Sequence, residues 1–282
     1  MANASGAQAK NEGEGALRVA SPWIEWLARL GYFSKGVLYL VIGILALNVA
    51  LNTRGQTPDT QDALQTIEIQ PFGQALLMII VIGLVGYSLW LFARGIMDTE
   101  DEGSDMSGLG RRVSFVARAV GHLVLALIAL QLLLGSGGES DGNNTASLAA
   151  RAMEQPWGRW LVGLVGLGFI AVGLSRLYLA YSERFREKLQ PNKMSNAEWD
   201  WMIWTGTLGI ASQGVVLLMI GSFLIQAAIQ YDPSEARGLG GAFQELLEQP
   251  YGPWLLGLMA LGFIAHGIYM FIRGRYRRIE VA

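Results

Sequence analysis

Six long stretches of this chain contain no charged residue, and they limit the folds open to it. They cover residues 36–53, 69–93, 119–138, 160–175, 201–231 and 249–272. Five of the six match or exceed the roughly 18 apolar residues that indicate a membrane-spanning helix. The fourth becomes long enough if Arg159 and Arg176, which bound it, extend toward the two membrane surfaces. We therefore predict an all-α polytopic membrane protein with six transmembrane helices.

A four-residue motif repeats three times along the chain. "QPFG" at 70–73 returns as "QPWG" at 155–158 and "QPYG" at 249–252. Proline suits the first turn of a helix, because its missing N–H would have no partner there. Each copy is therefore predicted to open the second helix of a hairpin. The signature residues are Pro71, Gly73, Pro156, Gly158, Pro250 and Gly252. Three tandem helical hairpin repeats with a pseudo-threefold arrangement follow from this spacing.

The first helices of the three hairpins also align with one another. "GYFSKGVLYLVIG" at 31–43, "SFVARAVGHLVLA" at 114–126 and "GIASQGVVLLMIG" at 209–221 place equivalent residues in columns. These columns are Lys35, Arg118 and Gln213; Gly36, Ala119 and Gly214; and, farther along, Asn48, Gln131 and Gln226. In the second helices, small residues recur at matched depths, which allows close helix approach.

These features together resemble a bacterial membrane family known as domain of unknown function 1206. The resemblance covers about residues 23–274 and rests on "ARLGYFSKGVLYLVIG", the Pro-aromatic-Gly motifs and the glycine-rich second helices. It implies three tandem two-helix transmembrane repeats and supplies no activity. The family's basic residue in the first helix is matched by Lys35 and Arg118 and replaced by Gln213.

The chain divides accordingly into repeats and connections. We predict a disordered cytoplasmic N-terminus at 1–22, hairpin repeats at 23–97, 111–182 and 196–274, an acidic linker at 98–110, a second linker at 183–195 and a basic tail at 275–282. Of the 21 Lys and Arg residues, 17 lie at the N-terminus, at the two linkers and at the C-terminus. The positive-inside rule therefore predicts a bacterial plasma (inner) membrane protein with both termini cytoplasmic.

Lys35 and Asn48 cannot both face the interior of the bundle. They are 13 residues apart, which is about 1300° of helix rotation and nearly opposite faces. We predict that the amides Asn48, Gln131 and Gln226 form an interior polar column, either bonding between helices, the favoured reading, or lining a solute path. Lys35, Arg118 and Gln213 then form a column near the inner interface, where the two cations extend to phosphate headgroups.

The second helices carry another polar stripe. Tyr87, Trp90 and Arg94 in the first copy align with His266, Tyr269 and Arg273 in the third. An interfacial anchor is the favoured reading, and a lipid or quinone site is the alternative. His122 and His266 are the only histidines, and they are the candidate cofactor ligands if a haem lies between the helices. The preferred reading is a hydrogen-bonded histidine, so no cofactor is predicted.

Several function classes find no support in the sequence. There is no cysteine, no zinc motif, no nucleophile elbow and no phosphate loop. The acidic segment at 98–105 begins like a calcium loop, but Leu109 stands where a bidentate Glu is needed, so no metal site is predicted. Basic clusters alternate with acidic residues beside the spans, which argues against nucleic-acid binding.

The favoured function is a non-enzymatic structural or accessory component that packs with other membrane proteins in the lipid bilayer. No Asp or Glu lies in the uncharged stretches, whereas proton- or cation-coupled transporters commonly use such residues. The alternative is a small-solute channel or transporter that uses the interior of the triple repeat. A binding module for haem, quinone or lipid is the third reading.

Overall fold

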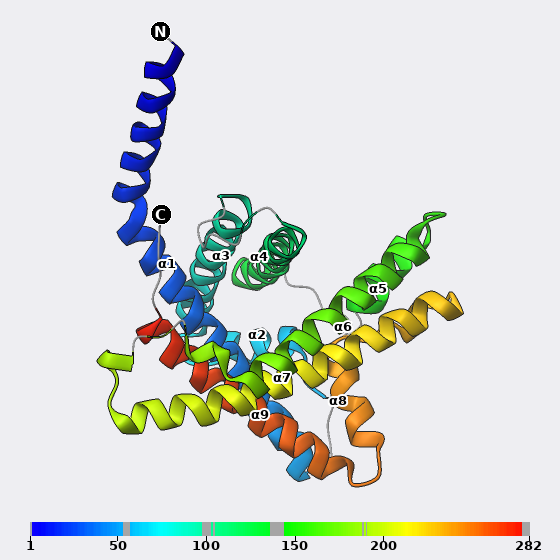
Figure 1. Ribbon diagram of the computed structural model, residues 1–282. Helices are drawn as coiled ribbons and strands as arrows, with labels where there is room; N and C mark the ends of the chain where they lie inside the picture. The colour runs from blue at the N-terminus through cyan, green and yellow to red at the C-terminus, as the bar shows by residue number, and fades with distance from the viewer. Residues whose placement is uncertain are drawn as a thin grey trace.

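The computed structural model describes residues 2–52, 57–97, 103, 105–135, 144–187, 189 and 191–277. Its long helices are α1 (Ala2–Asn52), α3 (Gly73–Met97), α4 (Met106–Leu133), α6 (Gly158–Ser182), α7 (Asn196–Gln230) and α9 (Gly252–Tyr276). Three short helices connect them: α2 (Thr60–Glu68), α5 (Asn144–Met153) and α8 (Leu239–Glu248). Within the described ranges there is no β-strand, only an isolated bridge between Leu189 and Arg277. Figure 1 shows the arrangement.

Six of these helices are long and apolar enough to cross a membrane. The spans run Trp26–Asn52, Gly73–Met97, Gly108–Leu133, Gly158–Ser182, Asn196–Gln230 and Gly252–Tyr276. The predicted all-α fold, with six spans in three helical hairpin repeats, is confirmed.

The first part of α1 differs from the sequence-based expectation. Composition predicts disorder at 1–22, whereas α1 begins at Ala2 and continues without a break into the first span. Figure 1 shows this part of α1 projecting away from the other helices. The alanines in this segment favour a helix locally, since alanine has the highest helix propensity. The predictions for most of the acidic linker and for residues 278–282 fall outside the described residues.

The repeated motif forms a hydrogen-bonded turn three times, with its aromatic residue left-handed in two copies, at φ 64° for Phe72 and 63° for Tyr251, and at φ −102° for Trp157. The amide of the motif glycine donates to the carbonyl of the motif glutamine, at 2.8 Å for Gly73 to Gln70, 2.9 Å for Gly158 to Gln155 and 2.8 Å for Gly252 to Gln249. The second helix therefore begins at the glycine, and the proline lies in the turn before it rather than in the first helical turn. A Cβ atom on any of the three glycines would overlap a carbonyl of the preceding short helix. The turn therefore requires glycine at its last position.

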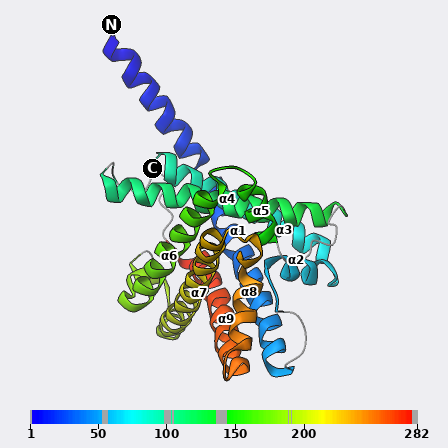
Figure 2. The same cartoon turned by 90° about the vertical axis from the view of Figure 1, so that its right-hand side faces the viewer.

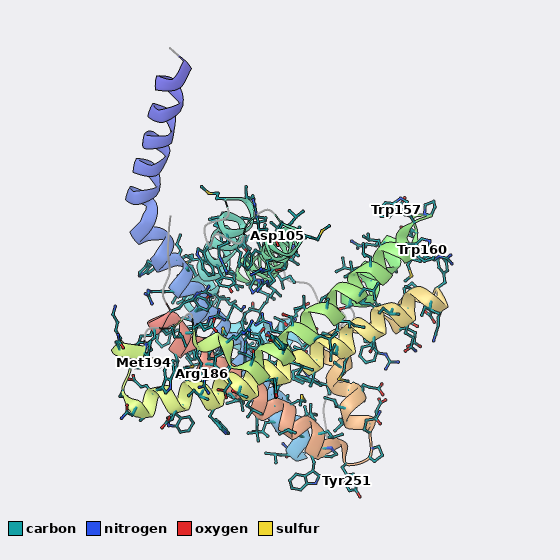
Figure 3. All side chains as sticks on the ribbon, viewed as in Figure 1. Asp105, Trp157, Trp160, Arg186, Met194 and Tyr251 are labelled. Carbon is teal, nitrogen blue, oxygen red and sulfur yellow. The ribbon has the colours of Figure 1, made fainter. Side chains whose placement is uncertain are left out.

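The three turns lie at the tips of diverging helices (Figures 1 and 2), and we call these tips together the motif end. Their aromatic residues Phe72, Trp157 and Tyr251 are exposed. Figure 3 shows Trp157 and Tyr251 projecting outward at the starts of α6 and α9. The opposite end, where α9 stops and residues 183–195 join α6 to α7, is the termini end. Ser195 caps α7 there, with its Oγ accepting from the amide of Glu198 at 3.3 Å.

The tightest contacts are made between repeats. The extensive helix pairs are α1 with α9, α3 with α4, and α6 with α7, and each pairs a first helix with the second helix of the preceding repeat in cyclic order. Helices of the same repeat also pack in two cases, α1 with α3 and α7 with α9. Figures 1 and 2 show the α6/α7 pair and the α1/α9 pair diverging from a shared region.

Candidate functional site: a cavity at the centre of the three repeats

Equivalent small residues form the contacts between repeats. Ser88 of α3 donates to the carbonyl of Ala119 of α4 at 2.8 Å. At the corresponding places, Gly267 of α9 faces Gly36 of α1, and Gly173 of α6 faces Gly214 of α7. The small-residue columns seen in the sequence are thus where the helix backbones approach one another most closely.

One of the three equivalent contacts within repeats is missing. In the described part of the chain, α4 and α6 of the second repeat do not pack extensively against each other, unlike α1/α3 and α7/α9. Accordingly α4 and α6 are the two spanning helices with the smallest buried share. The ring of three repeats is therefore open on one flank, between α4 and α6.

A cavity of about 160 Å³ lies where the repeats meet. Its lining residues are Lys35, Leu38, Tyr39, Ile42, Thr60, Leu84, His122, Leu125, Gln213, Val216, Leu217, Ile220, Leu239 and Phe263. These residues come from α1, α2, α3, α4, α7, α8 and α9. Among the six described spans, only α6 contributes no lining residue. The cavity therefore lies next to the open flank between α4 and α6.

Lys35 brings a positive charge to this cavity. Its ammonium lies 4.8 Å from the centre of the Tyr87 ring. No described side chain forms an ion pair with it, and none of the lining residues is acidic. Arg176 of α6, Arg273 of α9 and Arg118 of α4 all lie close enough to interact electrostatically with Lys35. The four cations come from four different helices.

Neutral hydrogen-bonding groups accompany these cations. Gln213 Nε2 donates to the hydroxyl of Tyr39, and Gln213 Oε1 is buried without a hydrogen-bond partner in the described chain. Rotating this amide by 180° lets Tyr39 donate to Oε1 and leaves Nε2 as the buried donor. Arg118 donates to the carbonyl of Ser114 at 3.0 Å, and its own carbonyl lies 2.6 Å from His122 Nδ1. The polar end of the cavity therefore contains several donors.

Aromatic rings and arginines close the cavity toward the termini end. Arg277, only 2% exposed, lies over Tyr32 and over Trp90, with 5.5 and 4.7 Å between guanidinium and ring centre. Arg94 lies 3.8 Å from the centre of the Phe115 ring and 4.7 Å from that of Trp90. We call Tyr32, Tyr87, Trp90, Arg94, Phe115 and Arg277 the aromatic layer.

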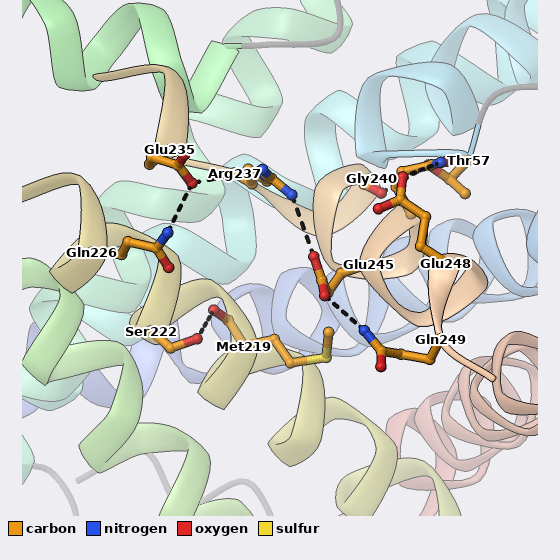
Figure 4. A network of polar contacts seen from close by, with 11 residues as sticks. Thr57, Met219, Ser222, Gln226, Glu235, Arg237, Gly240, Glu245, Glu248 and Gln249 are labelled. Atoms are coloured by element: carbon orange, nitrogen blue, oxygen red, sulfur yellow. Dashed lines mark hydrogen bonds and ion pairs between the residues drawn. The ribbon is translucent and has the colours of Figure 1, made fainter. Parts of the chain in front are cut away.

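The short helices cover the cavity toward the motif end. Thr60 of α2 and Leu239 of α8 are lining residues, and Thr57 Oγ1 donates to the Gly240 carbonyl at 2.8 Å. Figure 4 shows the polar network around α8, in which Arg237 pairs with Glu245 at 3.4 Å and Gln249 donates to Glu245 at 2.8 Å. Both ends of the cavity are therefore occupied by packed side chains.

The two predicted polar columns have exchanged faces. Asn48, Gln131 and Gln226 are exposed on the outside of the bundle, so the prediction of an interior amide column is wrong. Asn48 accepts from Asn52, and Gln226 donates to Glu235 at 3.1 Å. Lys35 and Gln213 instead line the cavity, and Arg118 lies beside it. The helices approach one another through the face of Gly36 and Gly214, which places the neighbouring Lys35 and Gln213 inside.

The second-helix stripe also lies inside rather than at an interface. Trp90, Tyr269 and His266 are buried, with 5.9 Å between the His266 and Tyr269 ring centres. His266 packs against Tyr39 at 4.6 Å and does not line the cavity, whereas His122 does. A cavity of about 160 Å³ lies below the roughly 300–1,000 Å³ of pockets for drug-sized ligands. This cavity is thus too small for a haem, and the alternative of haem ligation by the two histidines elsewhere is not tested by it.

Two residues of the site did not stand out in the sequence. Tyr39 follows Lys35 by four positions and therefore shares its helix face. Arg176 is the basic residue that bounds the fourth uncharged stretch, where the sequence indicates only an interfacial position. Within the described residues, no three His, Asp or Glu side chains gather as a metal site.

Comparison with known proteins gives the same division into three. The model of the family described as "Domain of Unknown Function (DUF1206)" matches residues 30–98, 113–183 and 208–277. "Uncharacterized protein YxxB" of Bacillus subtilis (strain 168) is 35% identical over 258 residues, which are 92% of this chain and 93% of that protein. No solved structure matches.

Proposed function

The chain belongs to the DUF1206 family, and we propose that it is a non-enzymatic membrane protein that binds an anion in its central cavity. The observation that carries the proposal is the Lys35 ammonium on the cavity, with Arg118 and Arg176 nearby and no acidic lining residue. We place the protein in the bacterial plasma membrane with both termini cytoplasmic, as the distribution of Lys and Arg favours.

The charge balance of the site supports anion binding. A charged side chain inside a membrane protein is costly unless it pairs with an opposite charge or reaches water. Here cations from α1, α4, α6 and α9 repel one another, and no described carboxylate pairs with Lys35. An anion bound among these cations is attracted to each of them and so offsets their mutual repulsion. Tyr39 and Gln213 add hydrogen-bond donors beside the charge.

The closed ends favour binding over an open channel. The aromatic layer fills the termini end, and α2 and α8 cover the motif end. A solute therefore meets packed side chains in both directions along the bundle axis. A transporter that opens these ends alternately would use the same anion site.

An accessory role in packing with other membrane proteins is a second candidate. The observation that favours it is the open flank between α4 and α6, two mostly exposed apolar helices. A partner helix seated there would copurify with the protein after mild extraction and would be lost when bulky residues are placed on the exposed α4 face.

The anion proposal is tested by thermal unfolding of the purified, delipidated protein. Inorganic phosphate at about ten times its Kd stabilises a single site by about 1.4 kcal/mol, which is an increase in Tm of about 3–6 °C. Sodium chloride at the same ionic strength is the reference. Lys35→Gln is expected to abolish the phosphate-specific increase.

Arg159→Gln is the matched control, because Arg159 is exposed at the other end of the membrane span. It is expected to keep the response of the wild-type protein. A phosphate effect equal to that of chloride, or one that survives Lys35→Gln in full, would contradict the proposal.

A further inference from the structure

The cavity has a polar end and an apolar end. Along α1 the lining residues run Lys35, Leu38, Tyr39 and Ile42; along α4, His122 and Leu125; along α7, Gln213, Val216, Leu217 and Ile220. These three helices are the first helices of their repeats, and Figures 1 and 2 show them inclined steeply to one another. In each of them the first lining residue is polar, and the last is apolar. Seven residues from Lys35 to Ile42 correspond to about 10 Å of helix.

This polarity matches an amphiphile better than a free inorganic ion. An ion such as phosphate contacts the cations and donors at the polar end and leaves the apolar end unused. A negatively charged headgroup with a hydrocarbon chain uses both ends, since apolar surface is best covered by apolar groups. The cavity holds about 160 Å³, so it accommodates only part of such a molecule, and the rest must extend outside it.

The open flank gives such a molecule a route from the bilayer. α6 contributes no lining residue, and α4 and α6 do not pack extensively in the described chain. On α4, the half-buried Leu125 and Ile128 share the helix face of Arg118 and His122, and on α6 the exposed Val165 shares that of Arg176. A hydrocarbon chain lying in this flank stays in contact with lipid and with apolar side chains along its whole length.

Arg176 lies on α6 and is close enough to Lys35 and His122 to act on both electrostatically. It is six residues before the end of α6 at Ser182, so it is about 9 Å from that end. That depth suits the phosphate of a lipid in the leaflet at the termini end. A headgroup between Lys35 and Arg176 is in contact with cations on both sides.

We infer that the anion of the proposed function is the phosphate of an anionic phospholipid, whose headgroup lies among Lys35, Arg118 and Arg176 and whose chain enters between α4 and α6. The inference rests on the proposed anion site. Zwitterionic lipids carry a cationic amine next to their phosphate, and the cations of the site repel it. The site therefore selects phosphatidylglycerol over phosphatidylcholine.

Native mass spectrometry of the delipidated full-length protein tests this selection. With equal amounts of phosphatidylglycerol and phosphatidylcholine added, the bound lipid is expected to be phosphatidylglycerol by at least about tenfold, since one charge pair in a partly buried site contributes on that scale. Arg176→Gln is expected to remove most of that preference. Arg159→Gln makes the same change at the other end of α6 and is expected to leave the preference unchanged.

A second variant separates the lipid from a free anion. Leu125→Phe fills the apolar end on the α4 side of the cavity and leaves Lys35, Arg118 and Arg176 in place. It is expected to reduce retention of phosphatidylglycerol while the Tm increase with inorganic phosphate persists.

The outcomes distinguish the two proposals. A Lys35-dependent response to inorganic phosphate without retention of phosphatidylglycerol overturns the lipid inference and leaves the anion site standing. Equal retention of the two lipids, or an unchanged preference in Arg176→Gln, also overturns the lipid inference. Absence of both the phosphate response and the lipid preference overturns both proposals.

Discussion

Gly173 of α6 and Gly214 of α7 contact each other backbone to backbone. A Cβ atom added to Gly173 would lie 2.9 Å from the Gly214 carbonyl oxygen, and one added to Gly214 would lie 3.1 Å from that of Gly173. Gly36 and Gly267 face each other in the same way in the α1/α9 pair, at 3.1 and 2.8 Å. Two of the three contacts between repeats thus depend on the absence of a side chain.

Gly173→Val is therefore expected to destabilise the protein by about 1–3 kcal/mol, because the added methyl groups force α6 away from α7. Thermal unfolding in detergent measures the effect as a lower Tm. Gly168→Val is the matched control on the same helix, since no atom lies within 4 Å of a Cβ built there. It is expected to change stability by no more than about 0.5 kcal/mol. Equal losses from the two variants would show that helix propensity, rather than close packing, determines the result.

The aromatic layer gives a second prediction, at Arg277. Its planar guanidinium stacks on Tyr32 and Trp90 and also donates to the Tyr32 hydroxyl. A lysine keeps the charge but lacks the planar group, so Arg277→Lys is expected to cost about 1–3 kcal/mol. Arg275→Lys is the control, because Arg275 is exposed two residues earlier. A Tm of Arg277→Lys equal to that of the control would contradict the proposed stacking.

The orientation in the membrane gives a third prediction. The chain has no cysteine, so single cysteines can be introduced at exposed positions on opposite ends. Glu248→Cys lies next to the third motif turn, and Lys193→Cys lies in the connection from α6 to α7. In intact cells a membrane-impermeant maleimide is expected to label Cys at 248 and to label Cys at 193 only after permeabilisation. The reverse pattern would place both termini outside.

Much of the fold could be predicted from sequence because the bilayer imposes simple rules. Uncharged length predicts the six spans, and the repeated Gln-Pro-aromatic-Gly motif predicts the three hairpins, as the structure bears out. The position of the proline was predicted less well. Its place in a turn depends on hydrogen bonding between Gln70 and Gly73, which the motif alone does not specify.

The site could be predicted only in part. The spacing of Lys35 and Asn48 shows that they lie on opposite faces, but it does not say which face is inside. The small residues next to Lys35 and Gln213 determine which face is inside. They pack against helices that are distant in sequence. The separation of α4 from α6 is not visible in the motif or the small residues of the second repeat. One sequence difference accompanies it: Val172, Ser175 and Leu179 stand where the other repeats carry the polar stripe of their second helices.

The separation of α4 from α6 also changes the surface that the protein presents to neighbouring molecules in the membrane. Three identical repeats in a closed ring would present the same lipid-facing surface after each rotation of one third of a turn about the bundle axis. Within the described residues, α4 and α6 stand apart on one flank of the cavity that Lys35 lines. The protein therefore presents an asymmetric surface in the membrane plane. Its rotation about the membrane normal determines which neighbouring molecule contacts the opening between α4 and α6.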